Sequence, residues 1–261
     1  MPPPMVQGAR VGLWYLSSYF PRLVTSRIVK RTPEVRAVGA SRSHSHLAER
    51  LQRVNVLAPT RICRVMTNHG SDKARAHNYT TVYSALFGER WKEPLRIFEL
   101  GLGSNNPGVP SNMGTFGVPG ASHRGWRTLF PHALVYGADV DRGILFHEDR
   151  IKTFYCDQLD PLSIRQLWSH PDLQGGMDII IEDGLHTFEA NVSFLEGSLD
   201  QLRPGGIYVV EDISASDVAN WYERLETVYA KKYPKYEFAF AILPDDGNWA
   251  NNMLVVRRGQ D

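Results

Sequence analysis

Cysteine and long apolar runs are what this 261-residue chain has least of. Its two cysteines, Cys63 and Cys156, are too few for a disulfide framework and lack metal-site spacing, so we expect a reducing compartment. No segment approaches the about 18 uninterrupted apolar residues that a membrane-spanning helix needs. The aromatic-rich residues 12–20 also lack the apolar composition and the cleavage site of a secretory signal. These absences predict a cytoplasmic protein.

Acidic side chains are scarce at the start of the chain. Residues 1–64 contain eleven lysines and arginines but only Glu34 and Glu49 as acids, whereas residues 65–261 carry net negative charge. A basic arm of this kind can dock on its own body or a sister subunit, meet an anionic surface, or stay solvated. Aromatic residues beside the basic ones in residues 10–36 suit peripheral membrane contact, and the charge contrast favours a homo-oligomer. Nucleic acid is not expected as a partner, because no groove-reading helix or aromatic–basic alternation is evident.

Short apolar runs alternate with helical patterns in the second half of the chain, which predicts an α/β domain with a mostly parallel sheet covered on both faces. The expected strands are 95–100, 133–138, 151–156, 177–181 and 206–210, and the expected helices are 122–130, 161–168, 188–202 and 215–232. Residues 236–243 and 252–257 flank a turn sequence and predict an antiparallel hairpin. The pattern is weaker near the start, where Leu47 and Leu51 share a helical face, so we expect a mostly helical, basic N-terminal extension over residues 1–65.

Residues 104–121 form an unusually long connection. The segment is rich in glycine and proline and has no periodicity. A compact domain rarely keeps such a loop unless it covers or binds a ligand. It follows the first strand of the predicted sheet, next to the edge where open α/β sheets bind ligands. We therefore predict a lid, with a disordered insertion as the alternative.

A glycine-rich turn ends the first predicted strand. The strand runs into Glu99-Leu-Gly-Leu-Gly103, and glycine at 101 and 103 allows the backbone to approach a ligand that a Cβ would exclude. A GxG pair alone also fits dinucleotide enzymes. The third glycine of a pyrophosphate fingerprint is missing here, however, and an acid precedes the pair.

The next two strands end in polar residues that suit a nucleoside. Asp139 ends the second strand and could bind both hydroxyls of a ribose, although Asp141 competes for that role. Asp157 and Gln158 end the third strand and could hydrogen-bond an adenine edge. Loop solvation or helix capping is the alternative use of these aspartates.

Two later strands each end in Glu-Asp, at Glu182-Asp183 and Glu211-Asp212. If the strands are neighbours, about 4.8 Å apart, their carboxylates converge and repel, so we expect a cation among them. Oxygen ligands without thiols favour Mg²⁺ or a similar hard ion over zinc. Side chains alternate along a strand, so Glu182 and Asp183 should point to opposite sides and not all four acids should bind the metal. His186 lies three residues after Asp183 and could remove a proton from a hydroxyl. As an alternative, the four acids could cap helices or pair with the basic arm.

ELGLG, then GAD about 35 residues later, then a third strand ending in aspartate, resembles motifs I to III of the class I S-adenosylmethionine-dependent methyltransferases. The resemblance implies a Rossmann-like, seven-stranded, mostly parallel sheet with a C-terminal antiparallel hairpin, in a methyltransferase domain over residues 95–261. It also implies that S-adenosylmethionine is held by Glu99, Gly101 and Gly103 at its methionine part, by Asp139 at its ribose, and by Asp157 and Gln158 at its adenine. Glu182 is likewise expected to bind the cofactor.

A second pattern resembles a narrower group. D-G-x-H at 183–186, with Glu-Asp 28 and 29 residues after the aspartate, is similar to the Mg-dependent sugar O-methyltransferases of macrolide and enediyne antibiotic pathways and to related actinobacterial glycoside methyltransferases. The resemblance implies Asp183, Glu211 and Asp212 as metal ligands, and Asp183 and His186 as catalytic residues with His186 as the base. An aspartate is usual in that group where this chain has Glu211.

The segment Gly70-Ser-Asp-Lys73, with His77, Tyr79 and Tyr83, resembles that group's G-[ST]-D-K element, which packs over the cofactor. The resemblance therefore implies a cofactor-covering segment over residues 66–94, with Ser71 and Lys73 among the residues that bind the cofactor.

These resemblances together imply a methyltransferase that uses S-adenosylmethionine and Mg²⁺ to methylate a sugar hydroxyl in a natural-product glycoside, glycolipid or polysaccharide precursor. A catechol-type or other small-molecule O-methyltransferase would share the cofactor and the ion. A nicotinamide-dependent oxidoreductase would share only the sheet, and a non-enzymatic partner protein would lack metal affinity.

Overall fold

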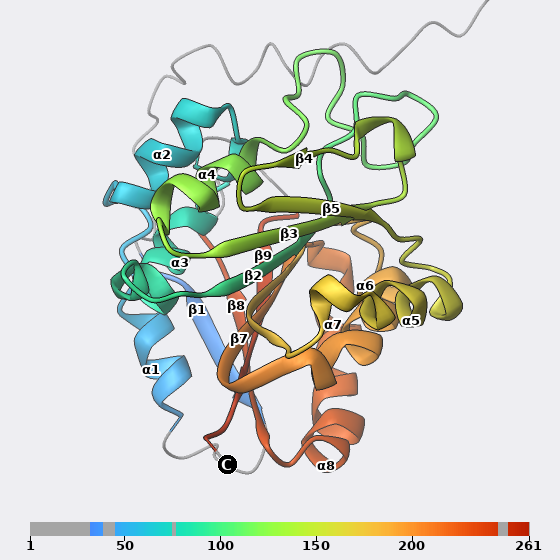
Figure 1. Cartoon of the computed structure of the whole chain (residues 1–261). Coiled ribbons are helices and arrows are strands. Elements are labelled where there is room, and N and C mark those ends of the chain that lie inside the picture. Colours follow the sequence, from blue (N-terminus) through green and yellow to red (C-terminus); the bar gives the residue numbers. More distant parts are fainter. Residues whose placement is uncertain (1–31, 39–44, 75–76, 245–249, 261) are drawn as a thin grey trace, which may run out of the picture.

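The computed structural model describes residues 32–38, 45–74, 77–244 and 250–260. Within them, nine strands form one sheet in the order β1-β8-β9-β7-β6-β2-β3-β5-β4 (Figure 1). The strands are β1 (Glu34–Val38), β2 (Arg96–Leu100), β3 (Leu134–Asp139), β4 (His147–Glu148), β5 (Ile151–Tyr155), β6 (Met177–Glu182), β7 (Leu202–Ile213), β8 (Tyr236–Ile242) and β9 (Asn252–Arg258).

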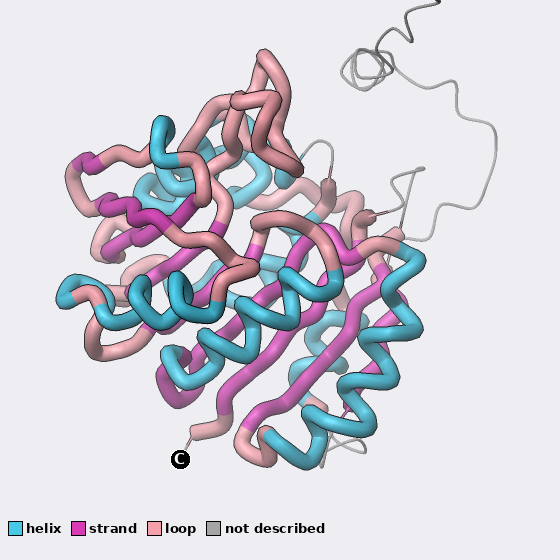
Figure 2. The backbone as a smooth tube through the Cα atoms, turned by 90° about the vertical axis from the view of Figure 1, so that its right-hand side faces the viewer, coloured by secondary structure: helices cyan, strands magenta, loops and turns pink. Residues whose placement is uncertain are grey.

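Helices cover both faces of this sheet. The α-helices are α1 (His46–Gln52), α2 (Arg61–His69), α3 (Tyr79–Phe87), α4 (Ala121–Leu129), α5 (Pro161–Ser169), α6 (Phe188–Ser198), α7 (Val218–Arg224) and α8 (Ala230–Lys232), with a π-helical turn at Leu225–Tyr229 joining the last two. Short 3₁₀ turns lie at Asp72–Ala74, Gly88–Arg90, Arg142–Ile144, Pro171–Leu173, Leu199–Gln201 and Ala215–Asp217. Helices α1 to α4 lie on one side of the sheet and α5 to α8 on the other, as Figures 1 and 2 show.

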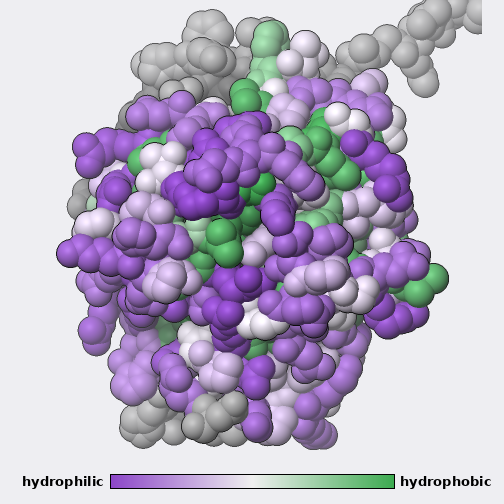
Figure 3. Space-filling model, viewed as in Figure 1, coloured by the Kyte–Doolittle hydropathy of each residue, from purple (hydrophilic) through white to green (hydrophobic). Residues whose placement is uncertain are grey.

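The alternation of side chains along the central strands builds two hydrophobic cores. Ile97 and Ile181 face the core under α1 to α4, whereas Phe98 and Ile180 face the core under α5 to α8. Because both faces of the strands are buried, their sequences are apolar almost without interruption. The surface drawn in Figure 3 is mainly hydrophilic, with small separate apolar areas.

The predicted parallel core and C-terminal hairpin are confirmed. Strands β7, β6, β2, β3 and β5 pair in parallel, and β9 runs antiparallel between β7 and β8. Strand β2 has β3 on one side and β6 on the other, so the chain changes direction across the sheet there. Such a switch point opens a crevice at the carboxyl ends of the strands.

The sheet is wider than the seven strands expected from the sequence. Strand β4 adds one edge through two residue pairs with β5, and β1 adds the other by pairing antiparallel with β8, from Glu34 opposite Ile242 to Val38 opposite Phe238. Strand β4 has only two residues, too few for a pattern, whereas β1 alternates polar Glu34 and Arg36 with apolar Val35 and Ala37, a strand signal that was missed. The described part of the predicted helical extension therefore contributes a strand as well as α1.

Two sequence predictions concern the first residues. Residues 10–31 of the expected membrane-contacting arm lie outside the described residues, and the predicted homo-oligomer stays a prediction. In the described part of the chain, none of the helices combines the length and the apolar composition that crossing a membrane requires.

Candidate functional site

A pocket of about 640 Å³ lies at the carboxyl ends of β2, β3, β5 and β6. This volume is within the range of about 300–1,000 Å³ that is common for small-molecule sites. Eleven of the predicted site residues line it: Ser71, Lys73, Gly101, Gly103, Asp139, Asp157, Gln158, Asp183, His186, Glu211 and Asp212. Two more predicted cofactor residues, Glu99 and Glu182, are buried outside the lining. The tertiary structure thus brings together most of the residues that the motifs selected.

The two glycines of the β2 turn are required by geometry. Gly101 has a φ of +94°, and a Cβ there would lie 1.9 Å from the carbonyl oxygen of Asp183. Gly103 has a φ of +80°, and its Cβ would lie 2.0 Å from the sulfur of Met113. Both the left-handed backbone and the close neighbours exclude larger residues.

Asp139 rather than Asp141 faces the pocket. One oxygen of Asp139 accepts from the amide of Leu102 at 2.8 Å and the other from the amide of Asp141 at 2.8 Å. Burial raises the pKa of Asp139, although these two amides act to lower it. Asp141 instead accepts from the Ser104 hydroxyl at 2.5 Å and does not line the pocket. The geometry therefore favours Asp139 for the predicted ribose contact.

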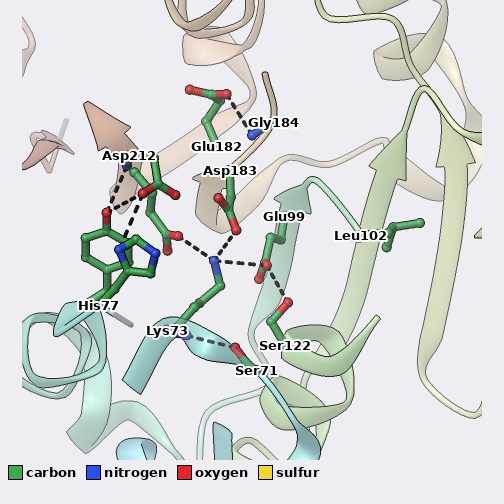
Figure 4. A network of polar contacts seen from close by, with 12 residues as sticks. Ser71, Lys73, His77, Glu99, Leu102, Ser122, Glu182, Asp183, Gly184 and Asp212 are labelled. Atoms are coloured by element: carbon green, nitrogen blue, oxygen red, sulfur yellow. Dashed lines mark hydrogen bonds and ion pairs between the residues drawn. The ribbon is translucent and has the colours of Figure 1, made fainter. Parts of the chain in front are cut away.

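Glu182 faces away from the other acids, as the strand alternation predicted (Figure 4). Its carboxylate accepts from the Gln158 amide at 2.8 Å and from the Gly184 amide at 3.2 Å. Burial raises the pKa of Glu182 to about 7. The Gln158 side-chain oxygen accepts from the Leu185 amide at 2.8 Å. Glu182 therefore supports Gln158 from behind, while Asp157 and Gln158 line the pocket.

The predicted lid forms part of the pocket wall. Its residues 109–113 line the cavity, and the Met113 amide donates to the Ser104 carbonyl at 2.8 Å. The Ser111 hydroxyl donates to the carbonyl of Leu185 at 2.8 Å, which joins the loop to the turn before His186. This loop has defined hydrogen bonds to the body of the domain, which favours the lid over a disordered insertion.

A buried lysine lies at the centre of the carboxylates (Figure 4). The Lys73 ammonium is 2.5 Å from an oxygen of Asp183, 2.5 Å from an oxygen of Glu211 and 3.5 Å from an oxygen of Glu99. Burial acts to lower the pKa of Lys73, but the three carboxylates outweigh it and hold that pKa well above its usual range. The side chain predicted to bind the cofactor is therefore engaged by protein acids.

The backbone explains why four acids from three strands share one side of the sheet. Glu99, Asp183 and Glu211 each lie two residues after a side chain of the core under α1 to α4, so they point to that side. Asp212 would face the opposite side by simple alternation. A register shift between Val210 and the strand end, together with a φ of +52° at Asp212, turns its side chain back.

Asp183, His186 and Asp212 form a candidate metal centre. Their ligand atoms lie within 4.8 Å of one another, with His186 Nε2 at 3.1 Å from Asp183 and 3.6 Å from Asp212. Burial acts to lower the pKa of His186, but Asp212 and Asp183 raise it to about 10. The two carboxylates suit a hard divalent cation such as Mg²⁺ or Mn²⁺, and the imidazole lies beside them. The predicted ligand Glu211 is not in this group; Lys73 and Tyr83 bind its two oxygens.

Sequence patterns marked Tyr79 and Tyr83 but assigned them no function. The Tyr79 hydroxyl donates to Asp212 at 2.9 Å and accepts from the Asp212 amide at 3.2 Å. His77 stacks on Tyr79 with ring centroids 4.7 Å apart and lies 3.5 Å from the same carboxylate. Tyr83 donates to Glu211. Helix α3 and His77, two residues before it, therefore hold the acids near the end of β7.

Other site residues were missed. Ser122 donates to the buried carboxylate of Glu99 at 2.5 Å, and the Trp126 indole donates to its second oxygen. No sequence signal marked these two donors. Val140 and Leu159 line the pocket with much of their apolar surface exposed. Val140 directly follows Asp139, and Leu159 directly follows Gln158. Their positions next to predicted cofactor contacts could have marked them as pocket residues.

The strand order, the switch-point pocket and the glycine turn define the fold of a class I methyltransferase. Comparison with solved structures agrees: the MycE methyltransferase from the mycinamycin biosynthetic pathway, solved with Mg and S-adenosylhomocysteine (SAH), matches with a TM-score of 0.57 and 21% identity, covering 82% of this chain and 60% of that one. No protein-family model matches the chain.

In sequence, the chain is similar to curated O-methyltransferases. It is 35% identical over 148 residues to the 8-demethyl-8-alpha-L-rhamnosyl tetracenomycin-C 2'-O-methyltransferase of Streptomyces olivaceus, a match that covers 57% of this chain and 36% of that protein. It is 33% identical over 138 residues to the demethylmacrocin O-methyltransferase of Streptomyces fradiae, with coverages of 52% and 32%. The chain thus matches about a third of the length of these relatives.

Proposed function

We propose that this protein is an S-adenosylmethionine- and Mg-dependent O-methyltransferase that acts on a hydroxyl of a sugar in a glycoside. The observation that carries the proposal is the meeting of Asp183, His186 and Asp212 in the wall of a pocket that also contains the Gly101–Gly103 turn and Asp139. The names of similar proteins support a sugar acceptor, since they include 2'-O- and 3'-O-methyltransferases of rhamnosyl tetracenomycins and an L-olivosyl-oleandolide 3-O-methyltransferase.

Different residues of the pocket would contact different parts of the methyl donor. The Gly101–Gly103 turn admits the methionine part against the backbone, and Asp139 can accept from both ribose hydroxyls. Asp157 and Gln158 offer hydrogen bonds to the adenine edge, and Val140 supplies an apolar surface beside it. By closing, residues 104–121 would exclude water and fix the approach of the acceptor oxygen to the methyl carbon.

Asp183, Asp212 and His186 face the place where the acceptor hydroxyl would lose its proton. A bound Mg²⁺ would polarise that hydroxyl and lower its pKa. If Asp183 and Asp212 held the ion, its charge would offset the two carboxylates that raise the pKa of His186. We propose that His186 then accepts the proton, with Asp183 orienting the imidazole through the 3.1 Å contact.

The oxidoreductase alternative is disfavoured by the chain path after the glycine turn. A pyrophosphate site usually places the first turn of a helix directly after the glycines. Here Gly103 leads into the long loop, and α4 begins only at Ala121. A catechol-type acceptor would use the same donor and ion, so a panel of acceptors separates that alternative.

The proposed function is tested by transfer of a labelled methyl group from S-adenosylmethionine to rhamnosyl and olivosyl polyketide glycosides and to catechols. We expect transfer to the glycosides, loss of activity with EDTA, and recovery when Mg²⁺ is restored. Activity that is indifferent to EDTA would remove the metal from the proposal. Transfer to catechols alone would replace the sugar acceptor, and binding of NAD but not SAH would replace the donor.

The role of His186 is tested separately with His186→Ala. If His186 is the base, the variant loses most of its turnover but keeps its affinity for SAH and Mn²⁺. Loss of Mn²⁺ affinity together with turnover would make His186 a ligand. Unchanged turnover would remove it from the mechanism.

A further inference from the structure

The acid cluster beside the pocket contains a cation of its own. Lys73 lies on the 3₁₀ turn after α2 and is 2% exposed. Its ammonium is equidistant, at 2.5 Å, from oxygens of Asp183 and Glu211, and Glu99 lies 3.5 Å away. A lysine with three carboxylates around it is both neutralised and held in place.

The carboxylate oxygens are divided between this lysine and the pocket. Both oxygens of Glu211 are used inside the protein, one by Lys73 and the other by the Tyr83 hydroxyl. Asp183 bridges the two sides, since one oxygen faces Lys73 and the other faces His186.

Asp212 lies on the pocket side, and its carboxylate is not one of the three that contact Lys73. Its carboxylate contacts Tyr79, His77 and His186. The candidate metal group accordingly contains Asp183, His186 and Asp212 and leaves out Glu211.

We propose that Lys73 is a positioning residue that engages Glu211 and one oxygen of Asp183, so that a single divalent cation binds between Asp183 and Asp212, beside His186. This inference rests on the metal dependence in the proposed function. It reverses the expectation that Glu211 is a metal ligand, and it gives the lysine of the Gly-Ser-Asp-Lys segment a role toward the metal centre instead of the methyl donor. Because the ammonium already lies between the inner oxygens of Asp183 and Glu211, it would repel a second divalent ion there.

The first test is a titration of the metal-free protein with Mn²⁺, followed by electron paramagnetic resonance. Wild type is expected to bind one ion. Glu211→Gln should keep its Mn²⁺ affinity to within about threefold. The matched change Asp212→Asn should lower that affinity by more than about 100-fold, because of these two acids only Asp212 is a ligand. Equal losses in the two variants, or two ions bound to wild type, would overturn the inference.

The second test measures the Lys73–Glu211 pair without metal or activity. Lys73→Met leaves buried carboxylates without a counterion and should lower the urea midpoint of unfolding. In the Glu211→Gln background the same change should lower the midpoint by clearly less, since one of those charges is gone. Equal shifts in both backgrounds would contradict the pairing. If Lys73→Met alone does not fold, a folded double variant supports the pairing and an unfolded one contradicts it.

The two sets of experiments separate this inference from the proposed function. If the Mn²⁺ pattern holds and no sugar is methylated, the proposed function fails while the inference stands. If sugars are methylated and Glu211→Gln loses its Mn²⁺ affinity, only the inference fails. If wild type binds no Mn²⁺, both the metal dependence and the inference are wrong.

Discussion

The substitution Gly101→Ala tests whether the β2 turn and the end of β6 form one rigid unit. The added methyl group would lie 1.9 Å from the carbonyl oxygen of Asp183, whereas real Cβ atoms essentially never approach within 3.0 Å. Either the turn or the backbone at Asp183 must therefore move. Because Asp183 also contacts Lys73 and His186, its displacement disturbs the candidate metal centre as well as the donor site.

The magnitude has two parts. A residue with a Cβ at a φ of +94° costs about 1–2 kcal/mol relative to glycine. Forcing a methyl group into a filled space costs about 1–3 kcal/mol more. Gly175→Ala is the matched control, because Gly175 has a similar φ of +88° but its Cβ would meet nothing closer than 3.9 Å. The control should therefore show only the backbone cost.

Urea unfolding monitored by circular dichroism measures the two losses of stability, and calorimetric titration measures SAH affinity. We expect Gly101→Ala to lose about 2–5 kcal/mol of unfolding free energy, against about 1–2 kcal/mol for Gly175→Ala. SAH affinity should fall by more than about tenfold (about 1.4 kcal/mol) only in Gly101→Ala. Equal destabilisation of the two variants, with SAH affinity retained, would refute the packing described for the turn.

Two further substitutions probe the groups behind the pocket. Tyr79→Phe removes the hydroxyl that donates to Asp212 and should lower Mn²⁺ affinity about 10–100-fold. Tyr83→Phe removes only the hydroxyl that donates to Glu211 and should leave Mn²⁺ affinity unchanged. Equal effects of the two variants in a Mn²⁺ titration would contradict the assignment of Asp212, and not Glu211, as a metal ligand. Because burial raises the pKa of Glu182 from 4.5 to about 7, its contribution to stability is fully present below pH 4.5 and is lost as the pH rises through 7. The side chain introduced by Glu182→Gln cannot ionise. The unfolding free energy of the variant minus that of wild type, measured by urea unfolding, should therefore increase by up to roughly 3 kcal/mol between pH 5 and pH 8. A difference that does not change with pH would contradict the raised pKa of Glu182.

Local patterns were sufficient for the central architecture. Uninterrupted apolar strands alternating with helical patterns predicted the parallel core, because burial on both faces of a sheet leaves a signature within each segment. The acids at the strand ends could be expected to meet, since parallel neighbours end at the same edge of a sheet. The glycines at 101 and 103 could be selected for a similar reason, as their conformational requirement belongs to the turn itself.

Contacts between distant segments were decided only by the tertiary structure. Lys73 and Glu211 are 138 residues apart, and no spacing in the chain indicates that the lysine reaches the glutamate. The direction of Asp212 depends on a register shift against β9 and a left-handed backbone, and both depart from simple alternation. The amino-acid sequence by itself thus determined which residues reach the ligand-binding edge, because burial and strand periodicity are local. The fold decided which of them face one another, because long-range pairing sets the direction of each side chain.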